Sequence, residues 1–313
     1  MASETPTVCV FAPSVLVTVT VETGNDEFDE MHFHLGGQGY WIARMIRELG
    51  ERPVLVAPVG GEAGQVVRGL VRSSGIDFAP VTIEGASPSY IHDRRDGERT
   101  QVASSRSPEL NRHEIDDLFA KTLHHALGAG LCVLTGKRAE DTLPVDFYRR
   151  LGSDLQATQI RSVGDLHGDE LTEFLEGGPI DILKVSDEDL ASDGLLDSGS
   201  EDDSQAWAAI AELQSSGTRA AVVSRGSGAL ASFKDARMRA AAPEFEVVDS
   251  SGAGDSMTAA LAVSLVRGLD PEESLRLACA AGAANVLRHG LASSPAELIG
   301  RLAPLIDVTR IDE

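Results

Sequence analysis

The second half of the chain alternates helical stretches with short apolar runs, and this pattern limits the fold more than any other feature. The apolar runs cover residues 131–134, 159–163, 182–185 and 220–224. Apolar strands that are separated by helices are typical of a parallel sheet with helices packed on its faces. The pattern therefore predicts an α/β fold built on a parallel sheet.

The first third of the chain adds strands of two kinds. Residues 8–11 and 54–59 are apolar throughout, as in a buried strand. Other segments are short and partly polar, and they cover residues 15–21, 31–35, 78–83, 89–93 and 100–103. Alternation of polar and apolar residues indicates a strand with one exposed face. We expect these segments to form a small sheet set apart from the core.

A glycine-rich turn at residues 247–258 carries the strongest chemical signal. Gly252 and Gly254 flank Ala253, Asp255 follows at once, and a helical apolar run comes next. Glycine lets the backbone approach a ligand, and the free N–H groups of a helix N-terminus favour an anion. A carboxylate repels phosphate, so we infer that Asp255 accepts the proton of a hydroxyl that attacks the phosphate. The alternative is structural, because Asp also caps helices.

Charge and composition exclude several classes of partner. The net charge of −22 at pH 7 argues against nucleic acid, which is bound by clustered Lys and Arg. No apolar run reaches membrane length and the N-terminus lacks a basic region, so we expect a cytoplasmic protein without a membrane partner. Cys9, Cys132 and Cys279 lie far apart in apolar surroundings and are expected to be buried free thiols.

A second glycine-rich segment, at residues 226–231, matches the loose dinucleotide-binding pattern. That interpretation requires a helix directly after the glycines and a place in the first βαβ unit. Residues 229–233 instead alternate like a strand, and residues 238–242 are suited to pair with them as a hairpin. We therefore do not expect a dinucleotide site here.

Four segments occur in an order that resembles the PfkB (ribokinase-like) carbohydrate kinases, and they lie at residues 36–43, 183–190, 222–229 and 252–255. Within this family the chain looks most like the 1-phosphofructokinase and tagatose-6-phosphate kinase branch, on residues 144–148, 164–165 and 281–286. The resemblance implies a doubly wound, mostly parallel sheet with helices on both faces and a small β-sheet lid. It implies one kinase domain over residues 1–313, with lid strands from about 14–35 and 78–104 inserted in the core.

The resemblance also implies ATP and Mg²⁺ and assigns residues to them. Asp255 matches the general base, and Gly252, Ala253 and Gly254 match the backbone that holds the transferring phosphate. Ser224, Gly226 and Gly228 match the family's ATP-binding segment. Lys184 matches a lysine near the nucleotide phosphates, and Asn285 lies in the region that borders the adenine.

The family's Asn-x-x-Glu pattern is Ser186 to Asp189 in this chain. Asp189 keeps a carboxylate that can order metal-bound water, and Ser186 keeps a hydrogen-bonding group. A hydroxyl is nevertheless shorter than an amide and has a different geometry. This is a moderate departure from the family on the metal side.

The acceptor side departs much further from the family. The substituted positions, with the glycines beside them, are Leu16, Gly36, Gly37, Gln38, Trp41, Pro88 and Tyr90. Leu, Gln, Trp, Pro and Tyr stand where the family has polar or charged residues, which predicts a pocket without its cations and a changed ligand. The alternative for the two aromatic residues is lid packing or a subunit contact. The neighbouring arginines Arg94, Arg95 and Arg106 are expected in an exposed turn.

These features predict an ATP-dependent phosphotransferase that acts on a hydroxyl of a small molecule, by family a sugar or sugar phosphate, with altered specificity. A nucleoside or secondary-metabolite kinase of the same fold is one alternative, and a non-catalytic nucleotide sensor is another. A homodimer through the lid is an expected assembly.

Overall fold

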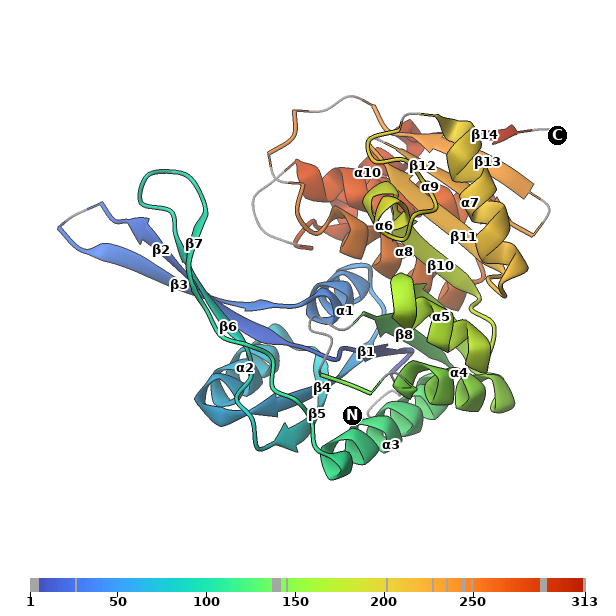
Figure 1. Cartoon of the computed structure of the whole chain (residues 1–313). Coiled ribbons are helices and arrows are strands. Elements are labelled where there is room, and N and C mark those ends of the chain that lie inside the picture. The colour runs from blue at the N-terminus through green and yellow to red at the C-terminus, as the bar shows by residue number, and fades with distance from the viewer. Residues whose placement is uncertain are drawn as a thin grey trace.

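The computed structural model describes residues 6–25, 27–136, 142–144, 146–200, 202–226, 228–234, 236–243, 246–248, 250–287 and 292–311. Val145, Ser227 and Asp249 of the motifs above lie outside these residues. The described residues form a ten-stranded sheet and a separate four-stranded sheet, with helices around the larger one (Figure 1).

The large sheet is parallel over most of its width. Its order is β14-β13-β12-β11-β10-β9-β8-β1-β4-β5, and every pairing from β11 to β5 is parallel. The bounds are Val8–Phe11 (β1), Pro53–Gly60 (β4), Asp77–Ile83 (β5), Leu131–Thr135 (β8), Arg161–Asp165 (β9), Ile182–Ser186 (β10), Ala220–Arg225 (β11), Gly228–Phe233 (β12), Ala236–Ala241 (β13) and Asp307–Ile311 (β14). The parallel sheet expected from the sequence is confirmed.

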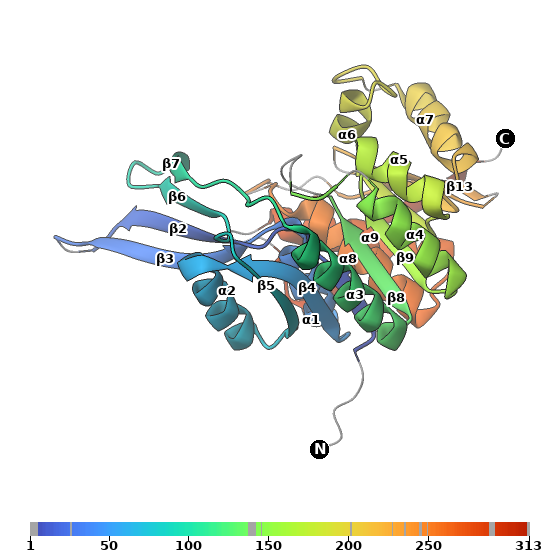
Figure 2. The same cartoon turned by 60° about the horizontal axis from the view of Figure 1, so that its bottom comes forward.

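Helices cover both faces of this sheet, as Figures 1 and 2 show. One face carries Gln38–Glu48 (α1), Gly61–Ser74 (α2), Ala253–Arg267 (α8), Pro271–Val286 (α9) and Ala296–Leu302 (α10). The other carries Arg112–Ala129 (α3), Phe147–Ala157 (α4), Gly168–Gly177 (α5), Asp187–Ser192 (α6) and Asp203–Ser215 (α7). Alternate residues of β1 enter the two cores: Val8 and Val10 pack on one face, Cys9 and Phe11 on the other. The sheet is therefore doubly wound, as expected.

The small sheet contains Leu16–Thr23 (β2), Asp29–Gly36 (β3), Ser89–Asp93 (β6) and Thr100–Ser104 (β7), in the order β3-β2-β6-β7. It projects from the core in both views and forms the lid (Figure 2). Residues 78–83 were expected in this sheet, but β5 pairs in parallel with β4 at the edge of the large sheet. The prediction failed because an edge strand with one exposed face shows the same polar alternation as a lid strand.

The chain does not end with α8 and α9. The chain continues through α10 and a short 3₁₀ helix at Ala303–Leu305 to β14, which pairs antiparallel with β13. Gly228 begins β12, which pairs with β13 as a hairpin, so no helix follows the second glycine-rich segment. Cys9, Cys132 and Cys279 are buried free thiols. None of the helices in the described part of the chain has the length and hydropathy of a membrane-spanning segment.

Candidate active site

The glycine-rich turn leads into the N-terminus of α8, as the sequence predicts. Gly252 is the N-cap residue with φ 80°, a left-handed conformation that suits glycine. Asp255 lies in the first turn of α8 and is partly buried. The Ala253 N–H donates to the Ser250 carbonyl at 3.3 Å, so the turn is braced by its own backbone. The helix end thus presents backbone N–H groups and one carboxylate together.

A cluster of buried polar groups lies behind this turn. Lys184 Nζ lies 3.7 Å from Asp165 Oδ2, and both residues are buried. Thr258 Oγ1 donates to the same carboxylate oxygen at 2.6 Å. Burial by itself would lower the pKa of Lys184. The charges of Asp165 and Asp255, followed by that of Asp189, outweigh burial and raise it, so the lysine is a fixed cation.

The Asp255 carboxyl group has a pKa suited to proton transfer near neutral pH. Burial raises the pKa of Asp255 to about 7, the charge of Asp165 raises it as well, and Lys184 opposes them. A general base works best when its pKa lies close to the working pH. A β-carbon placed on the neighbouring Gly254 would lie 2.5 Å from Lys184 Nζ, so the glycine leaves room for the cation beside the turn.

A pocket of about 560 Å³ opens on one side of the turn. Five of the residues predicted to bind nucleotide or phosphate line it: Ser224, Gly226, Gly228, Ala253 and Gly254. The other side of this pocket is formed by α9 and the start of α8 through Met257, Cys279, Gly282, Ala283 and Val286. The family resemblance had indicated the end of α9, at residues 281–286, but not Met257 or Cys279. Small and apolar side chains of this kind suit a flat, largely apolar ring system.

Asn285 is buried beside this pocket but does not line it. Its Nδ2 donates to the Ser251 carbonyl at 2.7 Å, and its Oδ1 accepts from the Ala292 N–H at 2.8 Å. Asn285 therefore connects the end of α9 to the glycine-rich turn. These two hydrogen bonds stabilise the backbone of the turn.

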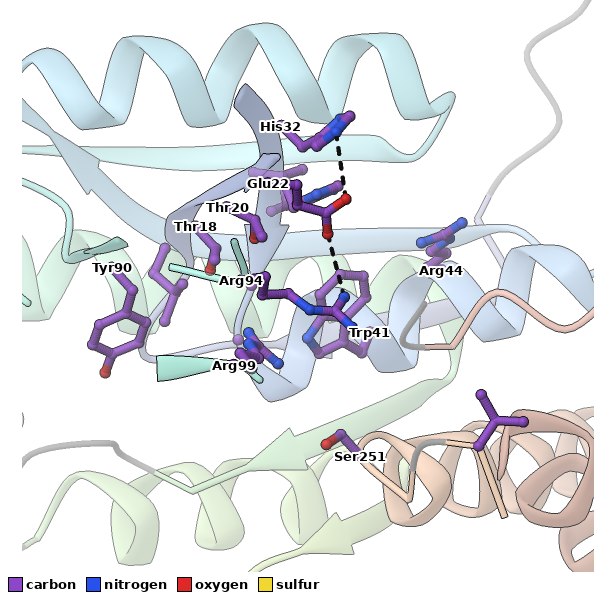
Figure 3. A pocket seen from close by; sticks show the side chains of 16 residues that line it. Thr18, Thr20, Glu22, His32, Trp41, Arg44, Tyr90, Arg94, Arg99 and Ser251 are labelled. Carbon is purple, nitrogen blue, oxygen red and sulfur yellow. Dashed lines mark hydrogen bonds and ion pairs between the residues drawn. The ribbon is translucent and has the colours of Figure 1, made fainter. Parts of the chain in front are cut away.

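A second pocket of about 760 Å³ lies on the other side of the turn, between α1 and the lid (Figure 3). The predicted acceptor residues that line it are Leu16, Gly36, Gly37, Trp41 and Tyr90. Gln38 is the first residue of α1 and does not belong to the described lining.

The two pockets share the glycine-rich turn as a wall. Val247 and Ser250 line the first pocket, whereas Val248 and Ser251 line the second. Asp255 follows Gly254 directly in the chain and belongs to the described lining of neither pocket. This arrangement brings a ligand in one pocket close to a ligand in the other, as a group transfer requires.

Comparison with known proteins identifies the family of the chain. Residues 12–297 match the profile of the pfkB family carbohydrate kinases. The chain belongs to the pfkB family. It is 28% identical to the ATP-dependent 6-phosphofructokinase isozyme 2 of Mycobacterium tuberculosis over 262 residues, which cover 82% of this chain and 76% of the relative. It is 24% identical to the 1-phosphofructokinase of Bacillus subtilis over 277 residues, covering 88% of each chain.

The fold agrees with solved structures of pfkB kinases. The phosphofructokinase-2 of Escherichia coli, in a complex with potassium, superposes with a TM-score of 0.85 at 23% sequence identity. The match covers 95% of this chain and 98% of that one. The chain is accordingly an ATP-dependent kinase of the pfkB family with an alcohol group as acceptor, which confirms the expected enzyme class.

Ser186 to Asp189, the segment that the family resemblance connects with the metal, forms the N-terminal cap of α6. Ser186 is the N-cap of α6: its Oγ accepts from the Asp189 N–H at 3.0 Å, and Asp189 Oδ2 accepts from the Ser186 N–H at 2.8 Å. Asp189 Oδ1 lies 3.9 Å from His167 Nε2. The two acidic residues before Asp189, Asp187 and Glu188, line the first pocket. Burial, and then the hydrogen bond and charge of Glu188, raise the pKa of Asp187.

These carboxylates fit a magnesium ion that arrives with the nucleotide. No group of three or more His, Cys, Asp or Glu side chains in the described part of the chain would hold a metal by itself. Mg²⁺ at nucleotide sites commonly uses one or two carboxylates together with phosphates and water. A pair of carboxyl groups at the pocket edge supplies such oxygen ligands.

The second pocket contains cations that were not expected from the sequence. Arg44, Arg94 and Arg99 all line it, so the expectation of a pocket without cations is wrong. Arg94 was expected in an exposed turn, yet its Nη1 lies 3.4 Å from Glu22 Oε1 inside the pocket. Arg95 does lie outside, where it pairs with the exposed Asp29 and the partly exposed Asp93 of the lid. Arg44 lies on α1, and Arg94 and Arg99 lie between β6 and β7, so alternation within the lid strands gave no signal for them.

Proposed function

We propose that this kinase transfers the γ-phosphoryl group of ATP to a hydroxyl of a sugar-like acceptor held under the lid. The observation that carries the proposal is the position of Asp255, with a pKa of about 7, beside a backbone turn shared by two pockets. The ionised carboxylate accepts the hydroxyl proton as the oxygen attacks the phosphorus. The N–H groups at the start of α8 and the buried Lys184 stabilise the negative charge on the moving phosphoryl group.

Magnesium completes the nucleotide side in this proposal. Glu188 and Asp187 at the pocket edge would hold it, and Asp189 would order its water shell from the start of α6. The ion supplies charge neutralisation of the phosphates when it is bound with ATP.

We further propose that the acceptor differs from the hexose phosphates of the named relatives. Leu16 is 3% exposed and packs on Gly36, where an added β-carbon would lie 2.5 Å from Leu16 Cδ1. This wall is apolar and offers no hydrogen bond to a sugar hydroxyl, which a polar site would exploit for recognition. Trp41 and Tyr90 add aromatic area to the pocket. Fructose 1-phosphate and tagatose 6-phosphate are accordingly expected to be poor substrates.

The test is an ADP-release screen with ATP and Mg²⁺ over sugars, sugar phosphates, sugar acids and nucleosides, with Asp255→Asn as the control. The proposal predicts acceptor-dependent ADP release in the parent alone. A kcat/KM of about 10⁴ M⁻¹s⁻¹ or more on fructose 1-phosphate or tagatose 6-phosphate would show ordinary enzyme efficiency and contradict the altered specificity. ATP binding without turnover of any acceptor would favour the nucleotide-sensor alternative.

We also propose that two copies associate through the lid. Its face opposite the pocket exposes Met31, Phe33 and Ile91, which are 64%, 55% and 39% exposed. Phe33 and Ile91 flank Val19 in register, so they lie on one face of the sheet. An apolar face of this kind on a projecting sheet suits a second copy as its cover. Light scattering should show a dimer that Phe33→Asp dissociates, and a parent that is monomeric at micromolar concentration would refute this assembly.

A further inference from the structure

Three chain segments connect the core to the lid, and they meet at one small cavity. Residues 12–15 join β1 to β2, residues 84–88 join β5 to β6, and residues 105–111 join β7 to α3. Each of these segments contributes residues to the cavity, which leaves about 10 Å³ open to a water-sized sphere. The cavity therefore lies at the base of the lid.

The lining of this cavity combines proline rings with hydroxyl groups. Each connecting segment supplies a proline and a serine: Pro13 and Ser14, Pro88 and Ser87, and Pro108 and Ser107. The core adds Thr142, which follows β8 and is 3% exposed. Because proline has no N–H group, the backbone at these three prolines cannot donate a hydrogen bond to the oxygens around the cavity.

Three hydroxyl oxygens of the lining are buried without a hydrogen-bond partner among the residues that the structure describes. They are Ser14 Oγ, Ser107 Oγ and Thr142 Oγ1. Six buried side-chain atoms in the described part of the chain share this condition, and half of them gather at this one cavity. A buried hydroxyl destabilises the fold unless a partner satisfies it, so the convergence of three points to one shared partner.

The size and the charge of the cavity decide which partner fits. A buried water needs roughly 10 Å³ of such space and typically makes about three hydrogen bonds. A metal ion fits poorly, because no charged residue belongs to the described lining. A buried charge without a counter-charge costs far more free energy than a buried polar group.

We propose that one water molecule binds in this cavity and joins the lid to the core through Ser14, Ser107 and Thr142. As a donor and an acceptor at once, the water satisfies hydroxyl groups that do not bond to one another. This site is separate from the two pockets of the proposed function and does not depend on it.

The water adds a link that the protein's own hydrogen bonds at the base of the lid do not supply. The Val17 N–H donates to the Pro88 carbonyl at 3.1 Å, and the Ser89 N–H donates to Ser105 Oγ at 2.8 Å. These bonds join the lid strands and their connecting segments to one another. The water joins two of those segments to Thr142 of the core, so it restrains the start of β2, where Leu16 lines the second pocket.

A crystal structure of the parent protein is the direct test of this site. Electron density should show a water oxygen within about 3 Å of at least two of the three hydroxyl oxygens. Density in which the three hydroxyls bond only to protein groups would overturn the proposal, as would a metal ion in the cavity.

A double-mutant cycle tests the shared water in solution. Thr142→Val keeps the shape of the side chain and should raise the equilibrium constant for unfolding by roughly tenfold, because the water loses a partner. Ser14→Ala should act in the same direction. Since both changes affect one water, their combined effect should be smaller than the product of the two single effects by about threefold or more. Independent effects of the two substitutions would overturn the proposal.

Two further variants serve as controls. Thr142→Ser keeps the hydroxyl and should retain most of the stability, which separates loss of the water from a failure to fold. Thr218→Val changes another buried threonine with an unpartnered hydroxyl, next to β11, and its effect should combine independently with that of Thr142→Val.

Amide hydrogen exchange shows whether the water restrains the lid. Exchange in β2 and β6 should be faster in Thr142→Val than in the parent and unchanged in Thr218→Val. Equal exchange in the parent and in Thr142→Val would contradict the link to the lid. None of these measurements involves phosphoryl transfer, so the failure of this site is distinguishable from the failure of the proposed function.

Discussion

Lowering the pH from about 8 to about 6 should reduce kcat/KM of this kinase roughly tenfold, because Asp255 must be ionised to accept a proton. Its pKa of about 7 makes the carboxyl group mostly ionised at the higher pH and mostly protonated at the lower. Below the pKa the loss should steepen to about tenfold per pH unit. The assay is the initial rate of ADP release between about pH 5.5 and 9 at constant ionic strength.

Two variants should move this profile in opposite directions. The charge of Asp165 raises the Asp255 pKa, so Asp165→Asn should shift the acid limb to lower pH. Lys184 lowers that pKa, so Lys184→Met should shift the limb to higher pH. Asp307→Asn, an exposed change on β14, is the matched control and should leave the profile in place.

The stability of Asp165→Asn and Lys184→Met must be measured in parallel, because each of these two substitutions leaves one member of the buried Lys184–Asp165 ion pair without its partner. Such a break costs about 3–5 kcal/mol, so unfolding of each variant should be checked by denaturant titration at each pH. The reasoning is refuted if folded Asp165→Asn and Lys184→Met shift the limb in the same direction, or if the parent shows no acid limb near pH 7.

Three further outcomes are expected. Folding raises the Asp255 pKa above its ordinary value, so between about pH 4 and 7 the folded state holds a proton that the unfolded chain releases, and the free energy of unfolding should fall as pH rises through that window. Asp255→Asn should remove this fall. A variant that is less stable than the parent at pH 8 would instead support a helix-capping role for Asp255. Gly254→Ala should weaken ATP binding about tenfold by displacing Lys184, with Gly69→Ala, where a β-carbon meets nothing, as the control in calorimetry. ATP with Mg²⁺ should raise the melting temperature and NAD should not, since β12 follows Gly226; stabilisation by NAD alone would contradict this assignment.

The fold was largely predictable because its signals are local. Strands β8, β9 and β10 each combine an apolar run with a helix before and after it in the chain, and β11 combines an apolar run with a helix before it. An apolar run between helices is what a strand buried on both faces requires. The edge strands were harder to predict from the sequence. β5 was assigned to the wrong sheet and β14 was missed, because partly exposed strands show polar alternation or little pattern at all.

The site was predictable where one short segment carries it and not where the lid assembles it. Asp255 and its glycines are adjacent in sequence, so their chemistry was apparent before the fold was known. Arg44 and Arg99 come from α1 and from the turn before β7, and only the pairing of the lid strands brings them to one pocket. The Lys184–Asp165 pair likewise depends on the order of β9 and β10 in the sheet.

The central claim is that Asp255 is the base of a phosphoryl transfer, and the most direct test is single-turnover phosphorylation of the acceptor by Asp255→Asn. The substitution keeps the size of the side chain and removes its basicity. The rate should fall by about 10²–10⁴-fold, the usual contribution of a general base, while ATP affinity measured by calorimetry stays within about twofold. A variant that turned over the acceptor at close to the parental rate would contradict the claim and leave Asp255 as a cap on α8.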